Sequence, residues 1–401
     1  MAGPDAADSV AVLEMRIPNG RTNAESTASH KVVIAGGGVA ALEALLTLRE
    51  LAQDRVEIDL VTPNAEFINR PMQLAALFHD ERVQHFDLTR IAADQGATLV
   101  PDRLEGVWPD KRVVMRSGTQ RSYDSLLIAI GAQLRVGVPG AMTVAAPGFR
   151  QDFLRALDDI ERGIARRLVF AAPAGTGWLL PLYELALLTA DNLAERAVTA
   201  ELLVVTPEDA PLEVFGLEAS EQLDGLLAER GIDVLAGHRP ISFDANGLVT
   251  APSGLIEADR TVALPSMRGP SIRGVPQTVA GFIATDRHAR VLGMEAVYAA
   301  GDGTAFPVKQ GGLAAQQADA AAEAIAAAAG AEVDPKPFAP VLRGLLLTGS
   351  APHYLRHDLT QPGTPTQTAE RSLWWPPTKV AARSLTPYLA ARPALELRTT
   401  T

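Results

Sequence analysis

The fold is decided by one stretch near the N-terminus, HKVVIAGGGVAA, which occupies residues 30–41. Its first half, His30–Ala35, is apolar and rich in β-branched residues, as a strand buried inside a parallel sheet would be. Three glycines close this strand, and apolar residues at helical spacing follow from Val39 to about Gln53. A second strand, Val56–Val61, completes a βαβ unit. We therefore expect an α/β fold built on a parallel sheet.

The loop after the first strand has the pattern GxGxxA, which consists of Gly36, Gly37, Gly38, Val39, Ala40 and Ala41. This pattern is typical of dinucleotide binding, because Gly36 permits a tight turn and Gly38 leaves room for a pyrophosphate against the backbone. The helix that follows directs free N–H groups and a partial positive charge toward the phosphates. A plain glycine-rich turn is the alternative, but the strand before the loop and the helix after it favour a dinucleotide.

One part of the dinucleotide fingerprint is missing. An acidic residue normally ends the second strand and binds the ribose hydroxyls. Here Thr62 occupies that position and Pro63 follows it, so we expect a weaker hold on the ribose. Glu57 and Asp59 lie earlier in the strand, on a side that we expect to be solvated or to face a helix.

Two later segments complete a set of three motifs. Tyr123–Gly131 has the pattern YDxLxxAxG, and Val297–Asp302 is another buried strand that ends in glycine and aspartate. Their order and spacing resemble those of FAD-dependent flavoproteins with two dinucleotide-binding domains, over roughly residues 30–330. Type II NADH dehydrogenases, sulfide:quinone oxidoreductases and flavocytochrome c sulfide dehydrogenases are similar in pattern. The resemblance implies two Rossmann-like, three-layer ββα domains and a C-terminal extension.

The same resemblance assigns roles near the flavin. It implies that Asp302, after Gly301, accepts a hydrogen bond from the ribityl chain of FAD. Gln310, Gly311 and Gly312 would begin a helix whose N-terminus faces the flavin and stabilises its reduced, negatively charged edge. Alternatively, Asp302 is only a helix-capping aspartate, and Gln310 to Gly312 only begin an ordinary helix.

Four further residues are assigned by the resemblance. Ala129 and Gly131 would be small so that the backbone can approach FAD, and the backbone of Leu104 would contact the adenine. Arg70 would belong to the loop over the flavin, with a surface salt bridge as its alternative use. Lys309 could bias the reduced flavin or an anionic substrate, although a solvated lysine is the more ordinary interpretation.

The second α/β block departs from the family pattern. In place of a second GxGxxG, the segment Ala171–Trp178 contains only Gly175-Thr176-Gly177, followed by bulky residues. The strand that ends at Thr206 again lacks a ribose-binding acid. Glu184 matches a glutamate that lies near flavin and nicotinamide in relatives, so it is the candidate catalytic residue, with a buried structural acid as the alternative. Binding of NAD(P)H is left open.

Composition narrows the classes of function. The chain has 401 residues, of which 47 are acidic and 36 basic, so its formal net charge is −11. A chain this acidic is a poor candidate for binding nucleic acid. It contains no cysteine, which excludes disulfides, thiol nucleophiles and the sulfur-carrying step of sulfide:quinone oxidoreductases. Its seven histidines show no metal-binding spacing, so no metal site is expected.

We expect four regions along the chain. Residues 1–29 are expected to be a disordered lead-in, since they lack the features of a signal peptide. The FAD-binding domain comprises residues 30–148 and 272–333, the second Rossmann-like domain comprises 149–271, and the extension comprises 334–401. No stretch has the roughly 18–20 apolar residues that span a bilayer. A cytoplasmic protein is therefore expected, with peripheral membrane contact as a further expectation.

The extension carries a positive charge that sets it apart from the rest of the chain. From Pro335 onward there are eight Lys or Arg and three Asp or Glu, a net charge of 8 − 3 = +5. Together with Trp374 and Trp375 this suits weak binding to an anionic membrane. The alternative is that these tryptophans pack the extension onto the FAD domain or onto the partner of a homodimer.

These observations predict an FAD-dependent oxidoreductase that passes electrons from a donor, through non-covalently bound FAD, to an acceptor such as a quinone. NAD(P)H is one candidate donor, and a small organic or inorganic compound is another. The alternative from a different functional class is an FAD-binding redox sensor or scaffold with little turnover.

Overall fold

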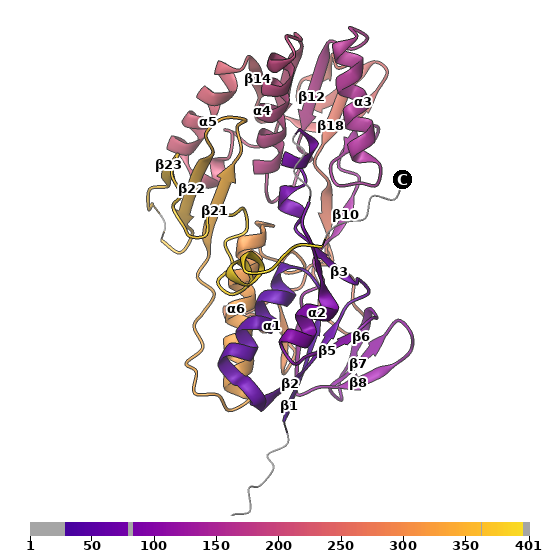
Figure 1. Cartoon of the computed structure of the whole chain (residues 1–401). Helices are drawn as coiled ribbons and strands as arrows, with labels where there is room; N and C mark the ends of the chain where they lie inside the picture. Colours follow the sequence, from indigo (N-terminus) through magenta and orange to yellow (C-terminus); the bar gives the residue numbers. More distant parts are fainter. Residues whose placement is uncertain (1–28, 79–82, 362, 396–401) are drawn as a thin grey trace, which may run out of the picture.

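The computed structural model describes residues 29–78, 83–361 and 363–395. The expected lead-in therefore lies outside the described residues, apart from Ser29. The chain forms two parallel sheets with their helices, and the sheet that contains β1 lies below the one that contains β12 in Figure 1.

The first sheet has five parallel strands in the order β20-β9-β1-β2-β5. Their bounds are β1 His30–Ala35, β2 Val56–Val61, β5 Thr98–Val100, β9 Ser125–Ile128 and β20 Val297–Ala299. Helices α1 (Val39–Ala52), α2 (Leu88–Asp94) and α6 (Gly311–Ala328) pack on one face. The strand β1 is buried on both faces, which explains its unbroken apolar sequence: Ile34 joins the core under the helices and Val33 the core on the opposite side.

An antiparallel meander covers that opposite face. It consists of β6 (Leu104–Trp108), β7 (Arg112–Met115) and β8 (Gln120–Ser122). Val107, Val113 and Met115 of the meander pack against Val33 and Val61 of the sheet. The unit therefore has the three layers expected of an α/β ββα domain, and α6 ends shortly before Gly330, whose φ of +78° favours glycine.

The second sheet repeats this plan with the strand order β11-β18-β12-β13-β14. Its strands are β11 Met142–Thr143, β12 Arg167–Ala171, β13 Glu201–Val205, β14 Ile232–Leu235 and β18 Arg260–Ala263. Its helices are α3 Phe149–Glu161, α4 Leu180–Glu195 and α5 Leu217–Glu229, and its meander is β15 Arg239–Asp244, β16 Gly247–Ala251 and β17 Gly254–Ile256. The next strand after this meander, β18, lies inside the parallel sheet and pairs with β12.

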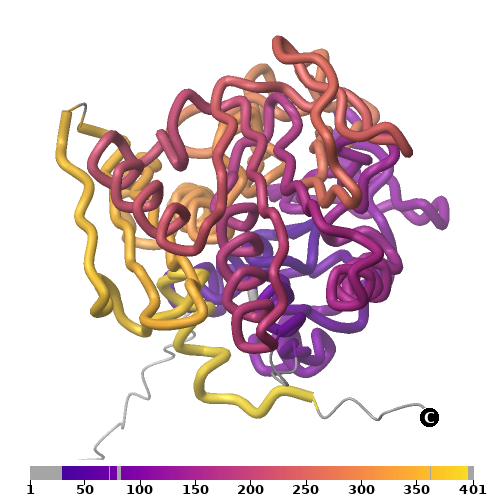
Figure 2. Tube along the Cα trace, turned by 90° about the horizontal axis from the view of Figure 1, so that it is seen from above, coloured from indigo at the N-terminus to yellow at the C-terminus, as the bar shows by residue number. Residues whose placement is uncertain are grey.

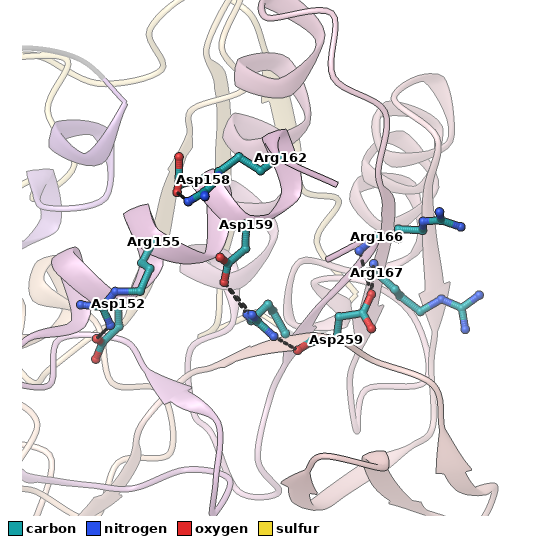
Figure 3. Close-up of polar contacts among 9 residues, drawn as sticks. Asp152, Arg155, Asp158, Asp159, Arg162, Arg166, Arg167 and Asp259 are labelled. Carbon is teal, nitrogen blue, oxygen red and sulfur yellow. Dashed lines mark hydrogen bonds and ion pairs between the residues drawn. The ribbon is translucent and has the colours of Figure 1, made fainter. Parts of the chain in front are cut away.

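Helix α3 is amphipathic, and its exposed face carries ion pairs at helical spacing (Figure 3). Asp152 pairs with Arg155, and Asp158 pairs with Arg162, at N–O distances of 3.1 and 3.2 Å. Such exposed pairs contribute only about 0.3–0.5 kcal/mol each. Asp159 reaches further and pairs with Arg260 of β18 at 2.6 Å, which ties the helix to the sheet.

Short elements join the two sheets. Strands β10 (Gln133–Arg135) and β19 (Ser266–Arg268) form an antiparallel ribbon where the chain passes between them. Strands β3 (Glu66–Ile68) and β4 (His85–Asp87) pair beside the loop that follows β3. Phe78 of that loop packs edge-on against Phe153 of α3, with ring centroids 5.9 Å apart, so the loop links the two units.

The C-terminal extension forms a third, antiparallel sheet that the sequence did not lead us to expect. Its strands are β21 (Val341–Leu346), β22 (His353–Asp358) and β23 (Gln367–Ala369), and the short helix α7 (Leu385–Ala390) follows. Figures 1 and 2 both show this sheet beside α5, while α7 lies against α1. Within the residues described, no helix is long and apolar enough to cross a membrane.

Candidate functional site

The glycine loop is shaped by contact with the end of β9. Gly36 has a φ of +138°, and a Cβ atom there would lie 2.2 Å from the carbonyl oxygen of Ala129. Any side chain would therefore collide with the backbone. A Cβ atom at Gly38, by contrast, would meet no heavy atom within 4 Å. Gly38 is the N-cap residue of α1, and no described side chain caps the N-terminus of that helix, so its N–H groups face the open side of the loop.

Thr62 lies directly beneath this loop. It is 1% exposed, and a Cβ atom at Gly37 would lie 2.8 Å from its Oγ1. The hydroxyl accepts a hydrogen bond from the N–H of Asn64 at 3.3 Å, while the adjoining Pro63 is exposed. Thr62 therefore supports both the loop and the turn after β2.

Asp59 does not lie on the solvated or helix-facing side of the sheet that we expected. Asp59 pairs with Arg121 of β8 at 2.9 Å, on the face of the sheet that the meander covers. It alternates with Ile58 and Leu60, which face the helices. Glu57 is exposed.

The ends of β9 and β20 meet the same loop. A Cβ atom at Gly301 would lie 3.3 Å from Cβ of Ala40, and the N–H of Gly301 donates to Oε1 of Gln317 at 2.7 Å. Gly131 has a φ of +72°, and its carbonyl oxygen would lie 3.0 Å from a Cβ atom at Gly303. The structure thus gathers the predicted small residues at the carboxyl edge of the first sheet, where open α/β sheets bind their ligands.

Asp302 and Lys309 lie on the loop between β20 and α6. Burial raises the pKa of Asp302, and the charge of Lys309 opposes that shift. Burial lowers the pKa of Lys309 to about 8, and the charge of Asp302 opposes it. The ammonium of Lys309 donates to the carbonyl of Thr304 at 2.5 Å and lies 4.0 Å from the ring centroid of Phe282. Lys309 is therefore largely enclosed and not the solvated lysine of the ordinary interpretation.

Helix α6 begins at Gly311, as the sequence predicted, and Gln310 caps it. The side chain of Gln310 accepts a hydrogen bond from the N–H of Leu313 at 2.8 Å. A Cβ atom at Gly311 would lie 3.0 Å from Cγ2 of Val380, so the C-terminal extension crosses the start of this helix. Next to it, Gly312 is buried.

The remaining predicted cofactor contacts lie around this edge. Val39 is the first residue of α1, and Leu104 is the first of β6, where it packs at the margin of the core under the meander. Arg70 is exposed after β3 and forms no ion pair with any residue that the structure describes.

Glu184 is buried and forms an ion pair with the C-terminal extension. It is 1% exposed on α4, and its carboxylate accepts from Lys379 of the extension and from the N–H of Leu347 at 2.9 Å. Burial raises the pKa of Glu184, and Lys379 opposes that shift. This ion pair gives Glu184 a structural partner next to the start of α6, and its catalytic role stays a prediction.

The glycine loop of the second unit is used for packing. A Cβ atom at Gly177 would lie 2.0 Å from the carbonyl oxygen of Pro307, so this glycine allows close contact with the loop before α6. Trp178 then packs against Phe215, with ring centroids 5.9 Å apart. A Cβ atom at Gly344 of β21 would lie 3.0 Å from that same Phe215, so the C-terminal sheet closes over these side chains.

An acid does follow β13, but it turns inward. Glu208 is 7% exposed and accepts from the hydroxyl of Tyr183 at 2.6 Å and from Thr206 at 3.3 Å. Burial raises the pKa of Glu208 to about 6, and the hydrogen bond from Tyr183 opposes that shift. The sequence position two residues after Thr206 gave no sign of this inward orientation.

These observations test whether the first unit fits FAD. The cradle at Gly36, the open approach at Gly38 and the partly buried Asp302 beyond β20 fit the pyrophosphate and ribityl roles assigned from the sequence. In the second unit Gly177 is already in contact with Pro307, while a Cβ atom at Gly175 would meet no heavy atom within 4 Å, so only part of that loop is open.

Comparison with known proteins agrees with this architecture. Residues 30–328 match the model of the pyridine nucleotide-disulphide oxidoreductase family. The chain is 26% identical over 265 residues to the sulfide-quinone reductase of Aquifex aeolicus, an alignment that spans 61% of this chain and 60% of that protein. It is 24% identical over 299 residues to an NADH dehydrogenase-like protein of Mycobacterium tuberculosis, which covers 68% of this chain and 72% of that protein.

Solved structures show the same fold. The sulfide:quinone oxidoreductase of Aquifex aeolicus superposes with a TM-score of 0.77 at 20% identity, covering 85% of this chain and 87% of that one. A putidaredoxin reductase, solved in covalent complex with putidaredoxin, superposes with a TM-score of 0.62 at 17% identity, covering 82% and 81%. The chain therefore belongs to the pyridine nucleotide-disulphide oxidoreductase family, FAD-dependent oxidoreductases whose members bind FAD and use NAD(P)H.

Proposed function

We propose that this protein oxidises a small donor other than NAD(P)H and passes the electrons, through FAD held by the first unit, to an acceptor such as a quinone. The observation that carries the proposal is the contact of Gly177 with Pro307, which uses for packing the glycine that a nicotinamide dinucleotide would need. Relatives named as a sulfide-quinone reductase and an NADH dehydrogenase-like protein support the class of reaction.

The second unit supports the choice of donor in two further ways. Glu208, the acid nearest the end of β13, is held by Tyr183 and Thr206, so a ribose would have to displace these hydrogen bonds. Trp178 and Phe215 pack together where α4 begins, and Gly344 of β21 packs on Phe215. A dinucleotide would therefore require the C-terminal sheet to move.

FAD, when bound, supplies the chemistry of accepting and releasing an electron pair. The chain would position it with the backbone of Gly36 and Gly38 and with the carboxylate of Asp302. Lys309 would place a positive charge near the start of α6, where it can favour an anionic donor or the negative charge that reduction creates. No thiol takes part, because the chain has no cysteine.

Anaerobic titration of the FAD-loaded protein tests the donor. We expect neither NADH nor NADPH to bleach the flavin absorbance, while dithionite bleaches it fully. Stoichiometric bleaching by either nucleotide would show that the second unit opens, and NAD(P)H would become the donor.

A second assay tests turnover. The dithionite-reduced protein, mixed with a soluble quinone or a dye under argon, should be reoxidised within the time of a stopped-flow record. Reoxidation that takes minutes would instead favour a redox sensor or scaffold.

A further inference from the structure

Two arginines face each other on the C-terminal sheet. Arg343 of β21 and Arg356 of β22 are opposite partners in the antiparallel register, so their side chains leave the same face of the sheet. Neither forms an ion pair with a carboxylate in residues 29–78, 83–361 or 363–395. Asp358 feels the charge of Arg356 but does not reach ion-pair distance.

The surroundings of Arg343 disfavour its charged guanidinium group. Its Nε atom is buried and has no hydrogen-bond partner among the described residues. Burial and the charge of Arg356 both lower the pKa of Arg343. Among the residues that the structure describes, Arg356 has one neutral partner, Oε1 of Gln367 at 3.2 Å. Like charges directly opposite each other destabilise a sheet, and buried donors normally find an acceptor.

The backbone beneath the pair is fixed from the side of α6. Gln310 donates to the carbonyl of Arg343 at 3.1 Å, and Gln316 donates to the carbonyl of Val341 at 2.9 Å and accepts from its N–H at 2.8 Å. The free edge of β21 is thus hydrogen-bonded to a long helix. A site held in this way loses little entropy when it binds a ligand.

The arginine face is only partly covered. The other face, through Gly344, packs on Leu180 and Phe215 of the second unit. On the arginine face, Trp374 of the extension packs edge-on against Tyr354, with ring centroids 5.0 Å apart. Arg343 and Arg356 are both partly exposed beside that contact. The pair therefore lies where a small ligand can reach it from solvent.

We propose that Arg343 and Arg356 bind a small anion with two or more oxygen atoms, either a carboxylate or a tetrahedral oxyanion. A guanidinium presents its donors in a planar fork that matches such oxygens. The anion would give Nε of Arg343 an acceptor and would offset the repulsion between the two charges. The site is separate from the FAD cradle and does not depend on the donor proposed above.

Calorimetric titration of the full-length, FAD-loaded protein tests the proposal. Sodium sulfate, sodium phosphate and sodium acetate are titrated separately at an ionic strength held constant with sodium chloride. We expect one of them to bind with a stoichiometry of one, and Arg343→Gln and Arg356→Gln each to weaken it at least tenfold. Arg371→Gln, which removes an exposed arginine from the same extension, is the matched control and should bind as the original chain does.

The outcomes separate the ligand classes. Binding of sulfate or phosphate identifies a tetrahedral oxyanion, and binding of acetate alone identifies a carboxylate. No heat with any of the three, or equal binding by Arg343→Gln and Arg356→Gln, overturns the proposal. Thermal melting in chloride buffer gives a second readout, in which Arg356→Gln should melt higher than the original chain because the repulsion is gone. If Arg343→Gln does not fold, Arg356→Gln alone decides the result.

Discussion

The ammonium group of Lys379 lies against the carboxylate of Glu184, a residue 195 positions earlier in the chain. Both side chains are buried, with 8% and 1% of their area exposed. The pair fixes the C-terminal extension to α4 and holds Val380 over the start of α6. The residue that the sequence offered as catalytic thus also anchors the extension in this structure.

Two acids of the first unit also hold the extension. Glu43 of α1 accepts from the backbone N–H groups of Ser384 and Leu385 at 2.8 and 2.6 Å, where α7 begins. Asp94 pairs with Arg392 at 2.9 Å. Basic residues of the extension therefore have acidic partners within the chain. This is what we expect if the extension packs onto the FAD domain.

Lys379→Met should lower the free energy of unfolding by about 3 kcal/mol, because it leaves the Glu184 carboxyl buried without its cation. The double variant Glu184→Gln/Lys379→Met should recover much of that loss. Urea denaturation measures both effects. Lys336→Met, which breaks an exposed pair with Asp334, is the control and should change nothing measurable.

Glu184→Gln separately tests the catalytic prediction. If Glu184 only anchors the extension, this variant should keep FAD and its half-reaction rates, measured by stopped flow, once its stability is accounted for. Slower half-reaction rates in a variant of unchanged stability would show that Glu184 has a catalytic role.

The two outer glycines of the first loop should respond differently to substitution. Gly38→Val should fold but purify without flavin, because its side chain meets no protein atom yet fills the approach of the pyrophosphate. Gly36→Ala should instead destabilise the fold, because of the contact with Ala129 and the φ of +138°. Circular dichroism and the ratio of flavin to protein absorbance separate the two effects. A yellow Gly38→Val protein would refute the cofactor assignment.

Glu43 of α1, which binds the start of α7, should make the stability of the protein depend on pH. Burial, with a contribution from Asp319, raises the pKa of Glu43 to about 7 from a reference of 4.5. The folded state then binds the proton more tightly than the unfolded state, so this stabilisation is complete below pH 4.5 and is lost as the pH rises to 7. Glu43→Gln should flatten that dependence and raise stability at pH 8 by on the order of 2 kcal/mol. Thermal melts from pH 5 to 8 measure it, and parallel curves for both proteins would contradict it.

Tyr183→Phe should cost more stability at high pH than at low pH. The hydroxyl of Tyr183 lowers the pKa of Glu208, which burial has raised to about 6. Without it the buried carboxylate loses a hydrogen bond, so we expect a loss of about 1–3 kcal/mol at pH 8 and a smaller loss at pH 5, where Glu208 is protonated. Denaturation at the two pH values tests this, and Tyr298→Phe, a buried tyrosine of β20, is a control that should show no such pH dependence.

The extension also allows a direct test of membrane contact. A chain ending at Gly363 would lack the partners of Glu184, Glu43 and Asp94, so we expect it to be poorly folded or insoluble. Trp375→Ala should not affect stability, since this side chain is 87% exposed. Co-sedimentation of the full chain with anionic vesicles at low and high salt then decides whether Trp375 binds lipid. No sedimentation at low salt would exclude that role.

The sequence by itself determined the first sheet, its glycine loop and the family. These features depend on local patterns: the strand, glycine turn and helix within residues 30–53, and the later motifs at residues 123–131 and 297–302. The absence of cysteine likewise limited the chemistry without any structure. The strands His30–Ala35 and Val56–Val61 and the helix that begins at Val39 have their predicted bounds to within one residue, because each has its own apolar period.

Only the tertiary structure decided what the acids and the extension do. Nothing local to Glu184 indicates Lys379, and nothing near Gly177 indicates Pro307, because each contact joins segments far apart in the chain. The C-terminal sheet was missed because its strands are short and mix charged residues with apolar ones, and they are stabilised by packing on α4 and α6 more than by their own pattern. Burial then set the charge and partners of each acid, and burial is a property of the folded chain alone.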